Sequence, residues 1–125
     1  MTLIEIKESH KPHEAKECSK SLLPVRDALY VLSGKWKIPI IIALAHGNKR
    51  FKELNREIEG ITPRMLSKEL KELEINDLVE RKVYDTMPVT IEYELTTHGM
   101  SLDNVITALR LWGIKHRKRI IEKSK

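Results

Sequence analysis

The chain has little of what marks several common classes of protein. Its single cysteine excludes an intramolecular disulfide framework and favours a reducing compartment, so we expect a cytoplasmic protein. The longest apolar run, Ile38 to Ala45, is too short to cross a bilayer. No basic stretch followed by an apolar one opens the sequence, so we expect no signal peptide. The absences together predict a protein that does not associate with a membrane.

Residue groups that would indicate an enzyme are also missing. The sequence has no glycine-rich phosphate loop, no Ser/His/Asp set, and no pair of acids at an evident cleft. His10, His13 and Cys18 are types of residue that bind metals, but three ligands on an arm make an incomplete site. We therefore expect no enzymatic activity, no metal and no cofactor.

Charge is present in quantity, and its distribution is uneven. The 125 residues include 23 bases and 18 acids, for a net charge of +5. Residues 1–23 sum to zero, whereas the last sixteen residues carry seven bases and one acid, a net of +6. This asymmetry favours a nucleic acid or an acidic partner. A hydrophobic content of 41% at this length is enough for one globular domain with a single core.

The spacing of apolar residues predicts a mostly helical domain over residues 21–125, preceded by a flexible N-terminal arm over residues 1–20. The expected elements, in order, are helices over 24–32 and 36–45, a short extended piece at 49–51, a brief helix through Leu54 and Ile58, a helix over about 62–76, strands over 78–84 and 89–95, and one long helix over about 96–122.

The helix over 62–76 is the segment around which we interpret the rest. Thr62 is a good N-cap residue, and Pro63 suits the first helical position because that position needs no N–H donor. Leu66, Leu70 and Leu73 recur at helical spacing and form one buried stripe. The opposite face shows hydroxyls and cations and, over its first two turns, no acid. Taken alone, this pattern fits a DNA-reading helix or an ordinary amphipathic surface helix equally well.

The neighbouring elements favour the first interpretation. Two helices joined by a tight turn at Gly60 form a helix-turn-helix, and the two strands that follow form a β-hairpin. We therefore predict a mostly α fold with a small β-hairpin, an α+β winged helix-turn-helix with extra N- and C-terminal helices. In such a fold the second helix of the pair enters the major groove of DNA.

The candidate DNA-binding residues differ in the role we expect of them. Arg64 and Lys68 lie one turn apart near the helix start and are the best candidates to contact base edges. Contacts with phosphates or bases are expected from Thr62, Pro63 and Ser67. Phosphate contacts, which set salt dependence but not sequence preference, are expected from Lys71, Lys49 and Arg50. Arg81 and Lys82, in the hairpin, either contact DNA or face solvent.

Five motifs spaced along the chain carry a resemblance to a known family. They are Gly34-Lys35-Trp36, Gly47-x-x-Arg50-Phe51-x-x-Leu54, Gly60-Ile61-Thr62-x-x-Met65-Leu66-x-x-x-Leu70-x-x-Leu73, Pro88-Val89-x-x-Glu92-Tyr93-x-Leu95-Thr96 and Leu109-x-x-Trp112-Gly113. Over about residues 18–116 the chain resembles the HxlR-type family of bacterial transcriptional regulators. The resemblance implies a DNA-binding repressor or activator that acts as a winged-helix homodimer.

Further features of the family follow from the same resemblance. The first and last helices are expected to form the dimer interface, through Leu29, Leu102, Val105, Ile106, Leu109 and Trp112. A dimer would recognise two half-sites of double-stranded DNA about one helical turn apart. Some members respond to oxidants or electrophiles through a cysteine placed where Cys18 stands, although Ser19 follows it here in place of the more usual proline.

Two alternatives stay open on the sequence alone. Lys16 and Lys20 would lower the pKa of the Cys18 thiol and adjacent Glu17 would oppose that, so Cys18 is either a redox sensor or a passive thiol. The alternative function is a winged-helix interaction module that binds an acidic protein partner. The exposed face of the helix over 62–76 lacks the aromatic or aliphatic anchors that such a module would show. Neither the operator, the genes controlled nor the effector follows from the sequence.

Overall fold

The computed structural model describes residues 15–124, and the side chains of residues 20–124. The chain divides into two compact units, residues 1–34 and residues 35–125. In the first unit, helix α2 (Ala15–Val31) already includes residues that we expected to lie in the arm, and Pro24 lies inside it. The predicted helix start at Pro24 is therefore wrong. Residues 15–20 lack an apolar stripe, but most of them are good helix formers, so propensity extends the helix without periodicity. Residues 1–14 lie outside the described part of the chain.

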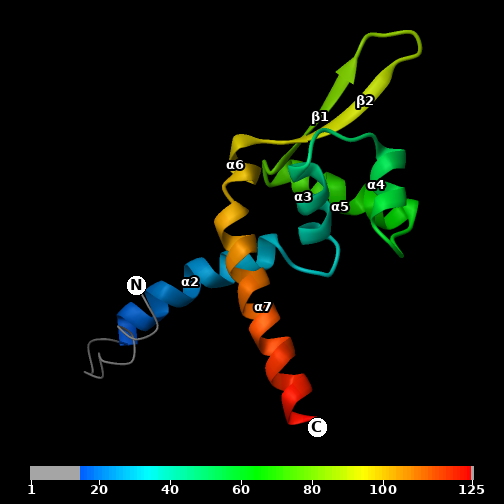
Figure 1. Ribbon diagram of the computed structural model, residues 1–125. Coiled ribbons are helices and arrows are strands. Elements are labelled where there is room, and N and C mark those ends of the chain that lie inside the picture. The colour runs from blue at the N-terminus through cyan, green and yellow to red at the C-terminus, as the bar shows by residue number, and fades with distance from the viewer. Residues whose placement is uncertain (1–14, 125) are drawn as a thin grey trace. The chain divides into compact units, whose positions relative to one another are not determined.

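The second unit is built around three helices, α3 (Lys37–Ala45), α4 (Phe51–Glu57) and α5 (Pro63–Ile75), as Figure 1 shows. Helix α3 contacts α4, α5 and strand β2 (Thr90–Leu95), which agrees with the prediction that this apolar segment lies at the centre of the domain. The largest fully buried side chains among the described residues all come from these helices and are Ile40, Ile41, Leu54, Leu66, Leu70 and Leu73.

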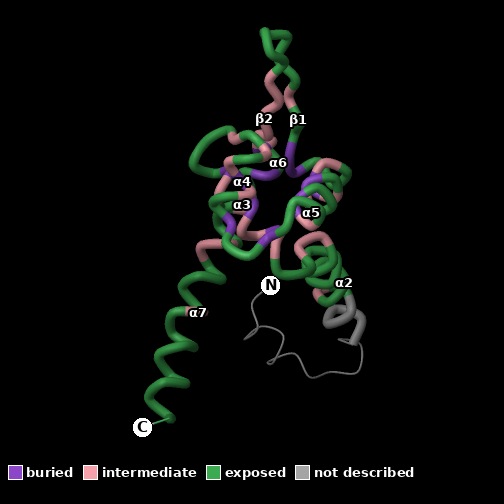
Figure 2. Tube along the Cα trace, turned by 90° about the vertical axis from the view of Figure 1, so that its right-hand side faces the viewer, coloured by how far each residue is buried: buried purple, intermediate pink, exposed green. Residues whose placement is uncertain are grey.

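An antiparallel β-hairpin projects from the helices (Figure 1). It pairs β1 (Val79–Tyr84) with β2, in a register that sets Val79 opposite Leu95 and Tyr84 opposite Thr90. Figure 2 shows that the base of the hairpin is buried and its tip exposed. Lys49 forms an isolated bridge with Tyr93 in β2, which ties the segment before α4 to the hairpin. The two predicted strands are confirmed to within one residue at each end.

The last part of the chain differs from the single long helix that we predicted. It forms a short helix, α6 (Thr97–Met100), and then α7 (Asp103–Lys123). Thr96 caps α6 by accepting a hydrogen bond from Gly99 N at 2.9 Å, and Leu102 N donates to the carbonyl oxygen of Gly99 at 3.2 Å. This three-residue bond replaces the four-residue spacing of an α-helix, so the helix is interrupted at residues 101–102. Over residues 15–124, no helix has the length and apolar character needed to cross a membrane.

Candidate nucleic-acid interface

Helix α5 begins as its sequence indicates. Thr62 adopts the extended conformation of an N-cap, and its Oγ1 accepts a hydrogen bond from Met65 N at 3.2 Å. Pro63 occupies the first turn, and Gly60, at φ +88°, supplies the left-handed turn between α4 and α5. Leu66 and Leu70 are fully buried, which fixes the face of α5 that points to solvent.

The solvent face of α5 carries every residue of this helix that we proposed from the sequence. Its exposed members are Thr62, Pro63, Arg64, Ser67, Lys68 and Lys71. Arg64, Lys68 and Lys71 fall on one side because residues three, four and seven apart share a helix face. The structure therefore places three cations and two hydroxyls on one exposed face of α5 and its N-cap.

Two acids of α5 are turned away from that face by a buried lysine. Lys37, in α3, lies 2.7 Å from Glu69 and 2.5 Å from Glu72, measured between Nζ and the nearer Oε2 atoms. Its side chain is only 5% exposed. Burial alone would lower the pKa of Lys37, but hydrogen bonds and charge from the two carboxylates outweigh burial and raise it above its ordinary value. The pKa of Glu72 is lowered, first by its hydrogen bond with Lys37 and then by the charge of Lys37.

The two cations before α4 differ in how available they are to DNA. Lys49 Nζ forms an ion pair with Glu57 Oε1 at 2.7 Å, so its charge is already partnered. Arg50 is the N-cap of α4, and its backbone N–H donates to Glu53 Oε1 at 3.0 Å. Arg50 is nevertheless exposed to solvent. The structure thus leaves Arg50 open to a phosphate and gives Lys49 a competing partner.

The hairpin separates the two cations that the sequence placed side by side. Successive residues of a strand point to opposite faces, so Arg81 shares a face with its partner Tyr93, and Lys82 shares the other face with its partner Glu92. Lys82 also forms an ion pair with Glu94 at 2.6 Å, and the hydrogen bond to that carboxylate, followed by its charge, raises the pKa of Lys82. Arg81 is exposed on the face without acids.

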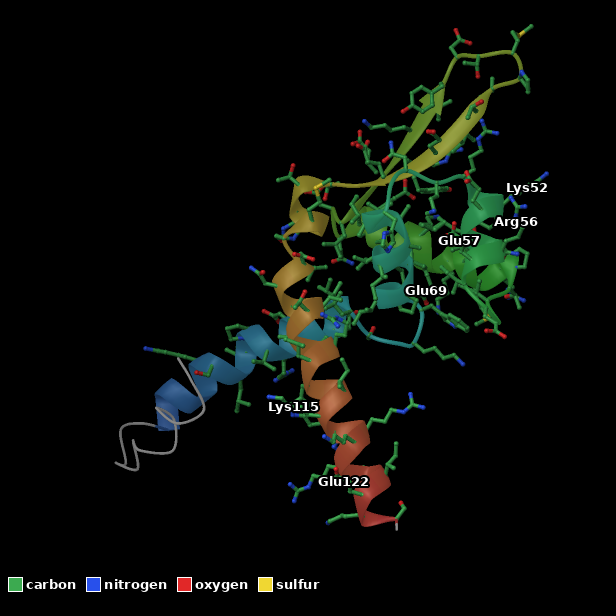
Figure 3. The ribbon with its side chains drawn as sticks, viewed as in Figure 1. Lys52, Arg56, Glu57, Glu69, Lys115 and Glu122 are labelled. Atoms are coloured by element: carbon green, nitrogen blue, oxygen red, sulfur yellow. The ribbon has the colours of Figure 1, made fainter. Side chains whose placement is uncertain are left out.

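Sequence reasoning missed two cations on α4. Lys52 and Arg56 are exposed, one turn apart, on the opposite side of the helix from buried Leu54 and Ile58. Figure 3 shows both side chains extending outward from α4. In helix-turn-helix proteins the first helix of the pair crosses the DNA backbone, so cations at these positions would meet phosphates. Their spacing of four residues, opposite the buried pair, was the signal that could have found them.

The residues expected at a dimer interface are exposed or half-buried within the single chain. On α7, Leu109 is 50% exposed, Trp112 is 64% exposed and Ile106 is half-buried, as is Leu102 just before the helix. Val105 is exposed as well, and so is Leu29 on α2. Large exposed apolar side chains on one element commonly mark an interaction surface.

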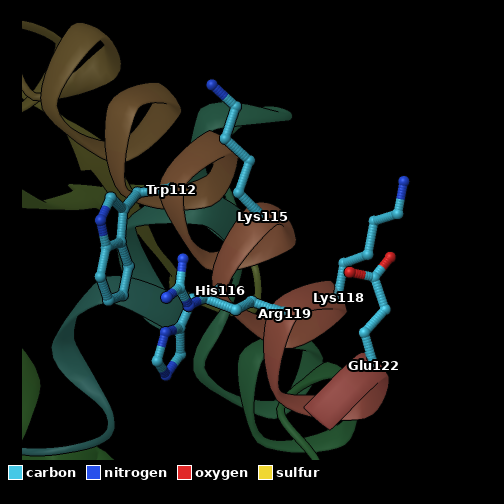
Figure 4. A pocket seen from close by; sticks show the side chains of 6 residues that line it. All are labelled: Trp112, Lys115, His116, Lys118, Arg119 and Glu122. Carbon is cyan, nitrogen blue, oxygen red and sulfur yellow. The ribbon is translucent and has the colours of Figure 1, made fainter.

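The outer part of α7 combines this apolar surface with cations. Figure 4 shows the ring of Trp112 beside that of His116, and the two are stacked with their centroids 4.7 Å apart. The other residues lining the same hollow are Lys115, Lys118, Arg119 and Glu122. These residues belong to the last sixteen of the chain, whose net charge is +6.

The side chains of Cys18, His10 and His13 lie outside the part of the chain that the structure describes. The side chain of Cys18 lies outside the described residues, although its backbone belongs to α2, and His10 and His13 lie outside them altogether. Among the residues that the structure does describe, no group of three histidine, cysteine or acidic side chains is arranged to hold a metal ion.

The sequence is similar to known regulators over most of its length. A family model described as an HxlR-like helix-turn-helix matches residues 31–121. YtcD of Bacillus subtilis strain 168, named an HTH-type transcriptional regulator, is 40% identical over 104 residues, which are 83% of this chain and 82% of YtcD. YodB of the same organism, also named an HTH-type transcriptional regulator, is 40% identical over 94 residues, which are 74% of this chain and 84% of YodB.

Solved structures give the same result for the fold. The crystal structure of ytcD aligns with a TM-score of 0.72 at 41% identity and covers 75% of this chain and 96% of that one. The redox regulator HypR in its reduced form aligns with a TM-score of 0.73 at 37% identity and covers 79% of this chain and 98% of that one. The winged helix-turn-helix fold predicted from the sequence is confirmed.

Proposed function

We propose that this chain, which belongs to the HxlR-like family of helix-turn-helix transcriptional regulators, binds double-stranded DNA as a homodimer with α5 in the major groove. Arg64 and Lys68 would contact base edges, and Lys71, Arg50, Lys52 and Arg56 would contact phosphates on either side. Regulators of this kind act where the DNA lies, which is the cytoplasm in bacteria, and catalysis is not part of the proposed role.

One observation carries the proposal. Residues 62–68, at the start of α5, contain the exposed Arg64 and Lys68 and no acid, while Leu66 points the other way into the core. A helix N-terminus also carries a partial positive charge, which adds to the attraction for phosphates. Cations, hydroxyls and a helix start on one surface suit a polyanion better than an apolar protein partner.

The test is to measure binding to the chain's own upstream DNA and to a random duplex of equal length, at two salt concentrations. Arg64→Ala should lose about 1–3 kcal/mol on the upstream DNA and much less on the random duplex, because a two-point contact with guanine is lost. Lys71→Ala should weaken both duplexes alike and reduce the salt slope by about one, as expected for one phosphate contact.

The same experiment separates the proposal from its alternative. Lys123→Met removes one cation from the end of α7 and serves as the charge-matched control, with both affinities expected to stay near wild type. Equal losses for Arg64→Ala on both duplexes would remove its base-reading role. If the wild type binds weakly, without preference, and only at low salt, the interaction module that binds an acidic protein becomes the better interpretation.

Homodimerisation is proposed from the exposed apolar side chains of α7 and α2. Leu109 and Trp112 lie one turn apart on α7, and together they would lose a large apolar area from water in a dimer. The dimer would place two copies of α5 at half-sites about one helical turn apart. Light scattering on Leu109→Asp should show a shift from dimer to monomer, and a variant that remains a dimer would exclude this interface.

Response to oxidants through Cys18 is a further part of the proposed function. HypR is named a redox regulator, and its structure exists in reduced and oxidised forms. We expect a thiol oxidant such as diamide to change the affinity of the wild type for its upstream DNA. The Cys18→Ser variant should bind equally with and without the oxidant. If the oxidant leaves wild-type affinity unchanged, Cys18 is a passive thiol and the signal lies elsewhere.

A further inference from the structure

The pair of acids on α5 poses a problem for a helix that is proposed to approach DNA. Helix α5 contains the bases Arg64, Lys68 and Lys71 and the acids Glu69, Glu72 and Glu74, so its own side chains sum to zero. Successive phosphates would repel any carboxylate that turned toward the groove, and the repulsion would act over about 10 Å at 0.1 M salt. The net attraction of α5 for DNA therefore depends on where its acids point.

The structure holds two of these acids on the protein side of the helix. Lys37 reaches from α3 to Glu69 at 2.7 Å and to Glu72 at 2.5 Å. Side-chain exposure falls from 41% at Glu72 to 13% at Glu69 and to 5% at Lys37, so the group leads inward from the edge of α5. Lys37 is too deeply buried to contact a phosphate itself.

If Lys37 were removed, Glu72 could form an ion pair with a cation of α5 itself. Glu72 lies one turn from Lys68, whose charge already contributes to lowering the pKa of Glu72. Without Lys37, Glu72 would have Lys68 as its nearest cation on the same helix. One of the cations proposed to read DNA would then be engaged by an acid of its own helix.

We propose that Lys37 is a positioning residue for DNA binding, which holds Glu69 and Glu72 against α3 so that the groove face of α5 meets phosphates without acids. The inference rests on the proposed function and assigns a role to a residue that never touches DNA. Lys37 acts through charge, and its effect should therefore be seen on specific and random duplexes alike and should weaken as salt is raised.

The test is a cycle of variants measured for DNA affinity at about 0.05 and 0.3 M salt. Lys37→Met, which keeps an unbranched side chain but removes its charge, should lower affinity for both duplexes about tenfold at the lower salt and much less at the higher. The triple variant Lys37→Met/Glu69→Gln/Glu72→Gln should return to within about twofold of wild type, because the acids that repelled DNA are gone. A purely structural role for Lys37 would instead lower the affinity of Lys37→Met by the same factor at both salt concentrations, in step with a loss of thermal stability.

The double variant Glu69→Gln/Glu72→Gln keeps the test decisive if Lys37→Met does not fold. We expect it to bind DNA within about twofold of wild type, since the two acids are already held away from the groove. An increase of tenfold or more would overturn the inference, because it would mean that both acids repel DNA in the wild type. Lys123→Met is the control for losing one positive charge, and thermal unfolding establishes that each variant is folded.

Failure of this inference is distinguishable from failure of the proposed function. If the wild type shows no preference for its upstream DNA, the proposed function fails, whatever Lys37 does. If the wild type shows the preference but the triple variant stays as weak as Lys37→Met, only the role of Lys37 is rejected.

Discussion

Gly99 in α6 lies against the carbonyl oxygen of Leu78, so closely that a Cβ on Gly99 would stand 2.2 Å from that oxygen. The same Cβ would lie 3.2 Å from Cδ2 of Leu95, at the end of β2. The contact is reinforced nearby, where Thr96 N donates to the carbonyl oxygen of Leu78 at 3.1 Å. Helix α6 is therefore docked on the base of the hairpin, backbone against backbone, at a position that only glycine allows.

Gly99→Ala should consequently destabilise the fold. A backbone oxygen cannot rotate away as a side chain can, so the hairpin base and α6 must separate, at a cost of about 2 kcal/mol. Urea unfolding should show a lower midpoint with an unchanged slope. Thr97→Ala, at an exposed position of the same short helix, is the control and should unfold with wild-type stability to within about 0.5 kcal/mol. Equal midpoints for Gly99→Ala and the wild type would show that the backbone around Leu78 can move to accommodate the methyl group without loss of stability.

Much of the second unit could be predicted from its sequence because the signals there are local. Thr62 and Pro63 mark a helix start within two residues, Leu66, Leu70 and Leu73 mark the buried face, and the alternation of Val89–Leu95 marks a strand. The exposed face of α5 follows from the buried one by geometry. These features needed no information about the rest of the chain.

The parts that escaped prediction depend on contacts between distant residues. Lys37 stands in an otherwise apolar helix, and its partners Glu69 and Glu72 follow 32 and 35 residues later, beyond any local pattern. The break between α6 and α7 lies close to the contact between Gly99 and the carbonyl oxygen of Leu78. The spacing of apolar residues gives no indication of that contact. The pairing of Lys82 with Glu94 likewise required the strand register.

The cap of α5 allows stability and DNA binding to be separated at one position. Thr62→Ala removes the acceptor for Met65 N and should cost about 1 kcal/mol of unfolding free energy. Thr62→Asn keeps an acceptor and should retain wild-type stability. Thr62→Asp also keeps the cap but adds a negative charge at the groove face, so it should fold normally and bind all duplexes more weakly. Thermal unfolding and DNA binding on the three variants check this, and equal stability for Thr62→Ala and Thr62→Asn would exclude a contribution from the cap.

Protonation of Glu72 should lower the free energy of unfolding at acidic pH. Its pKa is lowered from the ordinary value of 4.5, chiefly by the hydrogen bond from Lys37, so it favours the folded state above that value and loses this contribution as the pH falls through the lowered pKa. The difference in unfolding free energy between the wild type and Glu72→Gln should be constant well above pH 4.5 and should shrink as the pH falls below that value. Urea unfolding at several pH values measures it. In the Lys37→Met background the same difference should lose most of its pH dependence, and a dependence that persists there would assign the effect to another group.

The opposite faces of the hairpin should make Arg81 and Lys82 unequal in DNA binding. Arg81 is exposed on the face without acids, whereas Lys82 is paired with Glu94 at 2.6 Å. Arg81→Ala should therefore weaken binding to every duplex and reduce the salt slope by about one, because a freely available cation is lost. Lys82→Ala should weaken binding less than Arg81→Ala does, since Lys82 and the acids around it lie on the face of the hairpin opposite to Arg81. A larger loss for Lys82→Ala than for Arg81→Ala would mean that the hairpin approaches DNA by its acidic face and not by the face of Arg81.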